Sequence, residues 1–417
     1  MFDQHNPAFC RKKFYAFFWS GLATGIFFTI LSATDSILAG IFVGEQGVSA
    51  IAVTAPLSSI IGFVISVSVN GCRILYVEET ANYDKKKAGD YYSTAMTLLI
   101  ILSALFLMLI VLFGEKYYEI YDITGSMLEY SKQYFMFCKY VYVLTPFVTF
   151  IGQMVYIDGD LRLSTTAAAS YFILNILFSI AGVMLLGMAG IGLGTLLSGV
   201  VCLAINGIHF LRKNNTLKYH LHFSISEQGK LLRYSFMEST FALFSGINGV
   251  IITGFLCSRF GSEYLAVNSV VGYAMSLTAL FGSVSESMVP ILNTYRGEGN
   301  CDGVKKILRV SFKTLLVLSV IVTLAVLIAA PVFTDAFSIT SPEMKRVCVT
   351  GIRITALSYP FIGLMTVLPA YYNALGKNLL STVVARFKDS FFYVSFFILF
   401  GWLFGINGVW TGIALSP

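Results

Sequence analysis

The sequence contains little charge, and its cysteines are not paired. Of 417 residues only 12% are charged, about half of the roughly 25% expected of a soluble globular domain. The seven cysteines occur singly, without the spacing of a zinc or redox motif. The four histidines lie in predicted loops or at a helix end, and no nucleophile lies beside a base within an apolar segment. We therefore expect neither a soluble domain nor an enzyme.

What the sequence does contain is apolar segments of about 20 residues, repeated from end to end. Such a segment is long enough to cross the ~30 Å hydrocarbon core of a bilayer as a helix. The first follows Arg11, Lys12 and Lys13 and lacks a cleavage pattern, so we expect it to be retained. The predicted helices span residues 14–43, 47–77, 91–113, 129–153, 163–186, 190–211, 231–260, 262–295, 307–332, 347–375 and 379–404, and an incomplete twelfth starts near Gly408.

Basic residues are distributed unequally between the two sides of this predicted topology. Segments on the side of the N-terminus hold 17 Lys and Arg residues, against 4 on the opposite side. Because cytoplasmic loops carry an excess of basic residues, we predict a multi-pass protein of the cell membrane with its N-terminus in the cytoplasm. The net charge of +6 is explained by these loops, and we expect no nucleic-acid partner.

The two halves of the chain resemble each other. A shift of 214 residues places Gly40 on Gly254 and Pro146 on Pro360. A shift of 218 places the pattern that starts at Gly190 on a pattern of the same residue types that starts at Gly408. Each half contains an even number of helices, so the repeats have the same topology and are expected to be related by an axis along the membrane normal.

The predicted fold is therefore an all-α polytopic membrane protein of two six-helix bundles related by pseudo-twofold symmetry, with its last helix truncated. The predicted domains are an N-lobe over 1–212, a cytoplasmic connector over 213–230 and a C-lobe over 231–417. Transporters built from such repeats bind their substrate between the two lobes.

Several motifs, in order along the chain, resemble one known family. The motifs are TDSILAGIFVGEQGVSAIAVTAPL from Thr34, DGDLRLS from Asp158, GIGLGTLLS from Gly190, PILNTYRGEGN from Pro290 and YYNALGK from Tyr371. Together they are similar to the multidrug and toxic compound extrusion (MATE) family. The resemblance implies a drug/cation antiporter whose two bundles move around a central cleft, driven by sodium ions or protons.

The resemblance also implies a cation site in the first lobe. In many members an acid in helix 1, an Asn and an acid in helix 5 and a Thr in helix 6 form this site. Asp35, Asn175 and Thr195 match three of these positions, and Asp35 would be the ligand of a sodium ion. Ser179 stands in place of the second acid, so the predicted site holds one carboxylate instead of two.

Other charges within the predicted spans are candidates for the substrate cavity or for coupling, because burying a charge in a membrane costs ~2.5–3.5 kcal/mol on insertion scales. Glu238 could attract a cationic substrate, or pair with Arg233 near the interface. Glu286 and Arg73 lie at repeat-related depths and could pair across the lobes, or be solvated separately. Asp35 itself could instead be held by neighbouring hydroxyl groups for packing alone.

The functional prediction is secondary antiport that exports small organic cations in exchange for sodium ions or protons, without a cofactor. We expect a monomer in contact with membrane lipid. One alternative is a flippase or exporter of a lipid-linked or polysaccharide precursor from the same superfamily. An intramembrane enzyme is a more distant alternative.

In the second half, Arg386 and Asp389 are three residues apart and are predicted to neutralise each other along one helix.

Overall fold

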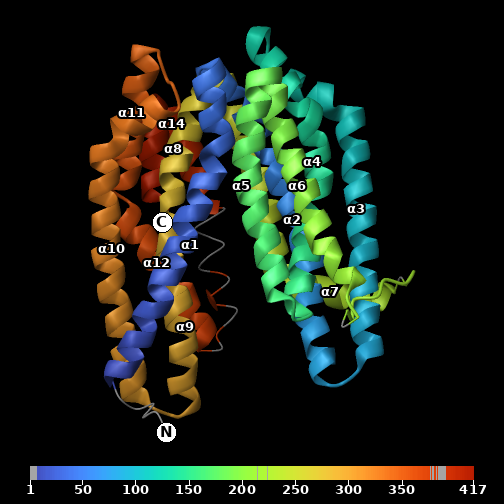
Figure 1. Ribbon diagram of the computed structural model, residues 1–417. Coiled ribbons are helices and arrows are strands. Elements are labelled where there is room, and N and C mark those ends of the chain that lie inside the picture. The colour runs from blue at the N-terminus through green and yellow to red at the C-terminus, as the bar shows by residue number, and fades with distance from the viewer. Residues whose placement is uncertain are drawn as a thin grey trace. The chain divides into compact units, whose positions relative to one another are not determined.

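The part of the chain that the structure describes is almost entirely helical and contains no strand. The computed structural model describes residues 7–417 except 214, 223, 376, 378–379, 382 and 384–390 (Figure 1). The first half contains α1 (Pro7–Val43), α2 (Glu45–Ala81), α3 (Lys85–Ile120), α4 (Gly125–Ile157), α5 (Leu161–Leu186), α6 (Met188–Gly207) and the 3₁₀ helix η1 (Ile208–Leu211). The second contains α7 (Ile225–Arg259), α8 (Tyr264–Ser276), η2 (Leu277–Phe281), α9 (Gly282–Gly297), α10 (Cys301–Ala336), α11 (Pro342–Ala356), α12 (Tyr359–Ala374) and α14 (Tyr393–Leu415).

The helices are long and apolar enough to span a membrane. Nine of the described helices qualify by length and composition, or ten if the bent pair α11 and α12 forms one span. A helix of 37 residues, such as α2, is about 55 Å long, so it extends beyond a ~30 Å hydrocarbon core. The exposed face of α10 is apolar and includes Leu316, Val320, Leu324 and Ile328. These features fit lipid as the solvent, because only segments that satisfy their own backbone hydrogen bonds can cross it.

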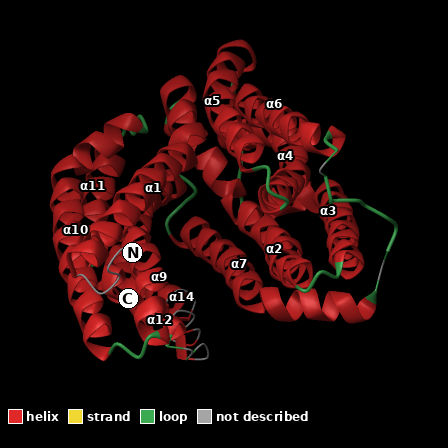
Figure 2. Cartoon of the chain, turned by 60° about the horizontal axis from the view of Figure 1, so that its bottom comes forward, coloured by secondary structure: helices red, strands yellow, loops and turns green. Residues whose placement is uncertain are grey.

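Packing divides the chain into two compact units. One unit contains Met1–Ile37 together with Ala266–Pro417, and the other contains Leu38–Leu265. Within the first unit, Gly21 of α1 approaches Ser283 of α9. Figure 2 shows the helices of both units as red ribbons. The predicted N-lobe (1–212) and C-lobe (231–417) were divided by the sequence repeat and not by packing, and this division stays a prediction.

In the second of these units, α7 packs along α2. A Cβ atom at Gly71 would overlap the backbone of Leu231, and one at Gly249 would touch the ring of Pro56. Small residues at such places let two helix backbones approach closely. In a membrane the hydrophobic effect does not drive helices together, so their association depends on this close packing. The core of this unit also contains the stacked rings of Tyr92 and Phe150 from α3 and α4.

The internal repeat is visible in the turns between helices. Tyr83 after α2 and Gly299 after α9 both have positive φ values, +62° and +68°, and they are 216 residues apart. The next residues, Asp84 and Asn300, each accept a hydrogen bond from the backbone N–H three residues later, over 3.0 and 2.8 Å. This cap satisfies one of the free N–H groups at the start of α3 and of α10.

The same correspondence holds where each half ends. Gly187 turns the chain from α5 into α6 with φ +59°, and Gly405 interrupts α14 with φ +68°. After each turn, a glycine lies so close to the helix before it that a Cβ would overlap a carbonyl group eight residues earlier: Gly190 against Gly182, and Gly408 against Phe400. Gly190 and Gly408, which the repeat places on each other, thus have the same close contact with the preceding helix.

Two predicted single helices are interrupted. The segment 262–295 becomes α8, η2 and α9, which together run over Tyr264–Gly297. The segment 347–375 becomes α11 and α12, which meet at a bend of 46°. Pro360 lies directly after this break, where it cannot donate a backbone hydrogen bond. The predicted pair of Arg386 and Asp389 lies outside the described residues.

Candidate functional site

The hairpin of α5 and α6 holds a polar pair within apolar helices. The Asn175 side-chain amide donates a hydrogen bond to Thr195 Oγ1 over 2.9 Å, and Asn175 is only 4% exposed. Thr195 Oγ1 in turn donates to the backbone carbonyl of Ile191. The contact is possible because Gly194, next to Thr195, lies directly against the backbone of Ser179. The structure therefore brings together two of the three predicted cation-coupling residues.

Ser179, which replaces the acid expected from the resemblance, is fully buried in the same hairpin. Its hydroxyl donates to the carbonyl of Ile191 over 3.4 Å. The hydroxyl is neutral, so this position adds no charge beside Asn175 and Thr195. Amide, hydroxyl and carbonyl oxygens can solvate a hard cation such as sodium, but they do not balance its charge.

Asp35, the third predicted coupling residue, lies in α1 and belongs to the other unit. It is half-buried, and its neighbour Ser36 makes a hydrogen bond of 2.7 Å with the Tyr273 hydroxyl of α8. The ring of Tyr273 stacks on Phe337 with 5.2 Å between centroids. Asp35 is thus placed beside a partly buried polar contact between α1 and a helix of the second half of the chain.

The other predicted charges have different surroundings. Glu286 of α9 is exposed, and its Oε2 lies 3.3 Å from the place that a Cβ at Gly21 would occupy. Arg73 of α2 is exposed and belongs to the other unit. Glu238 falls in α7, but its side chain lies outside the part that the structure describes. The predicted pair of Glu286 with Arg73 therefore stays a prediction.

A polar and ionic cluster that the sequence did not predict surrounds His209 in η1, directly after α6. The His209 ring lies between two carboxylates, with Nε2 2.7 Å from Asp158 Oδ2 and Nδ1 3.1 Å from Asp160 Oδ2. Arg212 Nη1 also contacts Asp160 Oδ2, at 2.6 Å. An ionised carboxylate can only accept, so the ring bonds both acids at once when each of its two nitrogens carries a proton. His209 is 49 and 51 residues from the two acids. In the sequence, only the DGD motif from Asp158 marked the turn between α4 and α5.

The charges in this cluster support one another. The pKa of Asp160 is lowered, first by its hydrogen bond from His209 and then by the charge of Arg212, against the effect of desolvation. Asp158 is also held by Thr216, through both its backbone N–H and its hydroxyl. The cluster thus fixes the turn between α4 and α5 to the chain that leaves α6.

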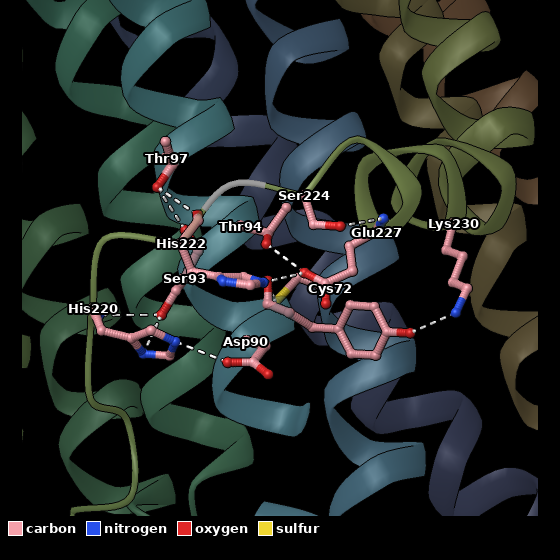
Figure 3. Close-up of polar contacts among 11 residues, drawn as sticks. Cys72, Asp90, Ser93, Thr94, Thr97, His220, His222, Ser224, Glu227 and Lys230 are labelled. Carbon is pink, nitrogen blue, oxygen red and sulfur yellow. Dashed lines mark hydrogen bonds and ion pairs between the residues drawn. The ribbon is translucent and has the colours of Figure 1, made fainter. Parts of the chain in front are cut away.

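A second polar cluster joins the connector after α6 to α3 and α7. His220 and His222 of the connector lie beside Asp90 of α3, and His222 also contacts Glu227 of α7 (Figure 3). The ligand-type atoms of Asp90, His220 and His222 lie within 4.8 Å of one another. Sequence analysis did not group these residues, because 130 residues separate the acid from the first histidine.

The chain is similar to known proteins in both sequence and fold. A model of the MatE family matches residues 22–181 and 240–388. The chain is 22% identical over 399 residues to the multidrug export protein MepA of Staphylococcus haemolyticus, covering 91% of this chain and 86% of that protein.

Solved structures of similar fold include two transporters of the MOP superfamily. A multidrug resistance MATE family transporter in its inward-facing conformation matches with a TM-score of 0.82 and 16% identity, over 93% of this chain and 91% of that one. A transporter from Pyrococcus furiosus, described with a binding pocket of reversed polarity that suggests a different function, matches with a TM-score of 0.74 and 16% identity, over 98% and 92%. The family model covers most of the chain, in both repeats, and the chain is a multi-pass membrane protein that belongs to the MatE family.

Proposed function

We propose that this protein exports small organic cations across the cell membrane in exchange for sodium ions or protons. Membership of the MatE family and the similarity to a multidrug export protein support transport of small molecules. The observation that carries ion coupling is the hydrogen bond between the buried Asn175 and the half-buried Thr195. A polar pair in an apolar hairpin is costly to bury, and it provides oxygen ligands that a cation can use.

Asp35 supplies the negative charge in this proposal. With Ser179 neutral, Asp35 is the carboxylate that can bind and release the coupling ion as the transporter changes conformation. A proton on Asp35, or a sodium ion beside it, removes the cost of a charge in an apolar environment. The ion therefore changes the relative stability of two conformations, as an antiporter requires.

The orientation in this proposal places the N-terminus and the connector in the cytoplasm. The unequal distribution of Lys and Arg supports this orientation. It also places both histidine clusters on the cytoplasmic side. The protein works as a monomer in the lipid bilayer, and its substrates are small organic cations.

Everted membrane vesicles test the proposal. Ethidium uptake into the vesicles is measured with a sodium gradient and with a proton gradient, each imposed separately. One of the two gradients is expected to drive uptake, and Asp35→Asn is expected to abolish it. Asp302→Asn, at an acid that is 97% exposed at the start of α10, is the matched control and should transport normally.

The results distinguish the parts of the proposal. Uptake that continues unchanged in Asp35→Asn would show that Asp35 does not couple the ion. Uptake that needs neither gradient would reject antiport. Absence of dye transport, together with movement of a fluorescent lipid-linked sugar in proteoliposomes, would favour the flippase alternative.

A further inference from the structure

We propose that Asp90, His220 and His222 form a binding site for a divalent transition metal ion, with Zn²⁺ as the preferred ion. The two histidines lie in the connector between α6 and α7, and Asp90 lies in the first turns of α3. Figure 3 shows the three side chains side by side. The candidate ligand atoms lie within 4.8 Å of one another. Around a zinc ion they would lie closer together, with each ligand atom ~2.0–2.2 Å from the ion.

Hydrogen bonds identify the nitrogen of His222 that is available to a metal. His222 Nε2 lies 3.0 Å from Glu227 Oε2, which also accepts a hydrogen bond from Thr94 Oγ1. A carboxylate only accepts, so Nε2 carries the proton, and in the neutral ring Nδ1 holds a lone pair. A histidine that donates its other N–H to a carboxylate is the usual arrangement of a metal ligand.

The surroundings of His220 fit the same chemistry. Nε2 lies 2.8 Å from Asp90 Oδ1, and Nδ1 lies 3.0 Å from Ser93 Oγ. A hydroxyl can both donate and accept, so Ser93 supports either tautomer of the ring. When a metal ion binds, it takes the place of the proton between Nε2 and Asp90. In the neutral ring that one proton then lies on Nδ1, which donates to Ser93 Oγ, so no proton is released.

The ligand set determines the class of metal. Two imidazoles and one carboxylate suit Zn²⁺, Ni²⁺ or Co²⁺, whereas Mg²⁺ and Ca²⁺ prefer oxygen ligands. The side chains of His220, His222 and Asp90 are 48%, 34% and 19% exposed, so ions can exchange with solvent and water can complete the coordination. The site lies apart from Asn175 and Thr195 in sequence and in its helices, and it does not depend on the transported substrate.

A bound metal ion would cross-link the connector to α3, because its ligands come from both segments. The ligands His220 and His222 are five and three residues before Ile225, the first residue of α7. The ion would therefore link the first half of the chain to the start of the second half, where the described residues 215–222 belong to no helix or strand. This cross-link would restrict the motion of the connector. The metal concentration in the cytoplasm could then affect transport.

Binding is measured on the full chain in detergent, purified through a tag without histidine that is then removed. Isothermal titration with ZnCl₂ should show one saturable site per chain, and MgCl₂ at the same concentration should show none. Asp90→Asn and His220→Ala should abolish the saturable site. Glu227→Gln removes only the partner of His222 and should weaken binding by roughly 10- to 100-fold. Tyr219→Phe, beside the ligands and 47% exposed, is the control and should bind as the wild type does.

A second measurement reads the ligands directly. Co²⁺ bound at the site should give visible absorption bands of a four- or five-coordinate ion, which Zn²⁺ removes by displacement. Zn²⁺ should also slow trypsin cleavage after the exposed Lys218 in the wild type but not in Asp90→Asn. Absence of a saturable Zn²⁺ site in the wild type, or unchanged binding in both Asp90→Asn and His220→Ala, would overturn the proposal and leave a hydrogen-bonded connector. Dye transport can fail or succeed independently of these results.

Discussion

The Asn175 amide donates to Thr195 Oγ1 over 2.9 Å, across two helices whose backbones touch at Gly194. The close backbone contact and the polar pair depend on each other. A larger residue at Gly194 would separate α5 from α6, and the amide would then lose its acceptor while still buried. The candidate coupling residues are therefore positioned by glycine packing as well as by their own hydrogen bond.

Thr195→Val tests the polar pair. Valine has nearly the same shape but lacks the hydroxyl, so the buried Asn175 amide loses its acceptor at a cost of about 1–3 kcal/mol. We expect a lower unfolding temperature in detergent and loss of gradient-driven ethidium uptake. Thr195→Ser keeps the hydroxyl and is the control. Normal coupled uptake by Thr195→Val would exclude this hydroxyl from the ion site.

Gly190→Ala and Gly408→Ala test whether the packing repeats. At both positions a methyl group would overlap the carbonyl of the preceding helix, and we expect each change to destabilise the protein by roughly 1–3 kcal/mol or more. Gly207→Ala is the control, because nothing lies within 4 Å of a Cβ there and alanine favours the helix. Thermal unfolding of the three variants in detergent measures the difference. Equal stability of Gly190→Ala and Gly207→Ala would contradict the close contact.

The sequence allowed the helices, the repeat and this glycine match to be predicted, because each depends on local composition or on periodic similarity. The breaks before Gly282 and Pro360 were harder to predict, since apolar residues continue through both. The histidine clusters could not be predicted. His209 and Asp158 are 51 residues apart, and nothing in either local segment specifies that the fold brings them together. The same limit applies to Asp90 and His220.

His209→Gln tests the buried ionic cluster. Glutamine cannot reach both Asp158 and Asp160 as the ring does, so Asp158 loses a donor in a site where the histidine is 3% exposed. Leaving a buried acceptor without its donor costs roughly 1–3 kcal/mol. We expect a large fall in unfolding temperature. His222→Gln, at a partly exposed histidine, is the control and should cost less than about 1 kcal/mol in metal-free buffer. Equal effects of the two changes would contradict a buried cluster.

Asp160→Asn tests the pH dependence of the same cluster. The folded protein lowers the pKa of Asp160, so the ionised carboxylate stabilises the fold at pH values above the unfolded pKa of about 3.9. This contribution is lost as the pH falls through the lower, folded pKa. At pH 7 the variant should unfold at a lower temperature than the wild type, and the difference should shrink below about pH 4. Asp302→Asn, at an exposed acid, should show no difference at either pH. A gap that grew on acidification would mean that the sign of the pKa shift is wrong.

Tyr83→Gly tests the turn that the two halves share. Tyr83 has φ +62°, where a residue with a side chain is less stable by about 1–2 kcal/mol, whereas the other half has Gly299 at the same place. The Tyr83 side chain is 91% exposed, so its removal sacrifices little packing. Glycine loses more entropy on folding, about 0.5–1 kcal/mol, and the net gain in stability should therefore be up to about 1.5 kcal/mol. Gly299→Ala should lower stability by a similar amount, and Gly297→Ala, which stands at a helix end without a positive φ, should not. Because nothing lies within 4 Å of a Cβ at either glycine, a difference between these two alanine variants in thermal unfolding would isolate the backbone conformation from steric contact.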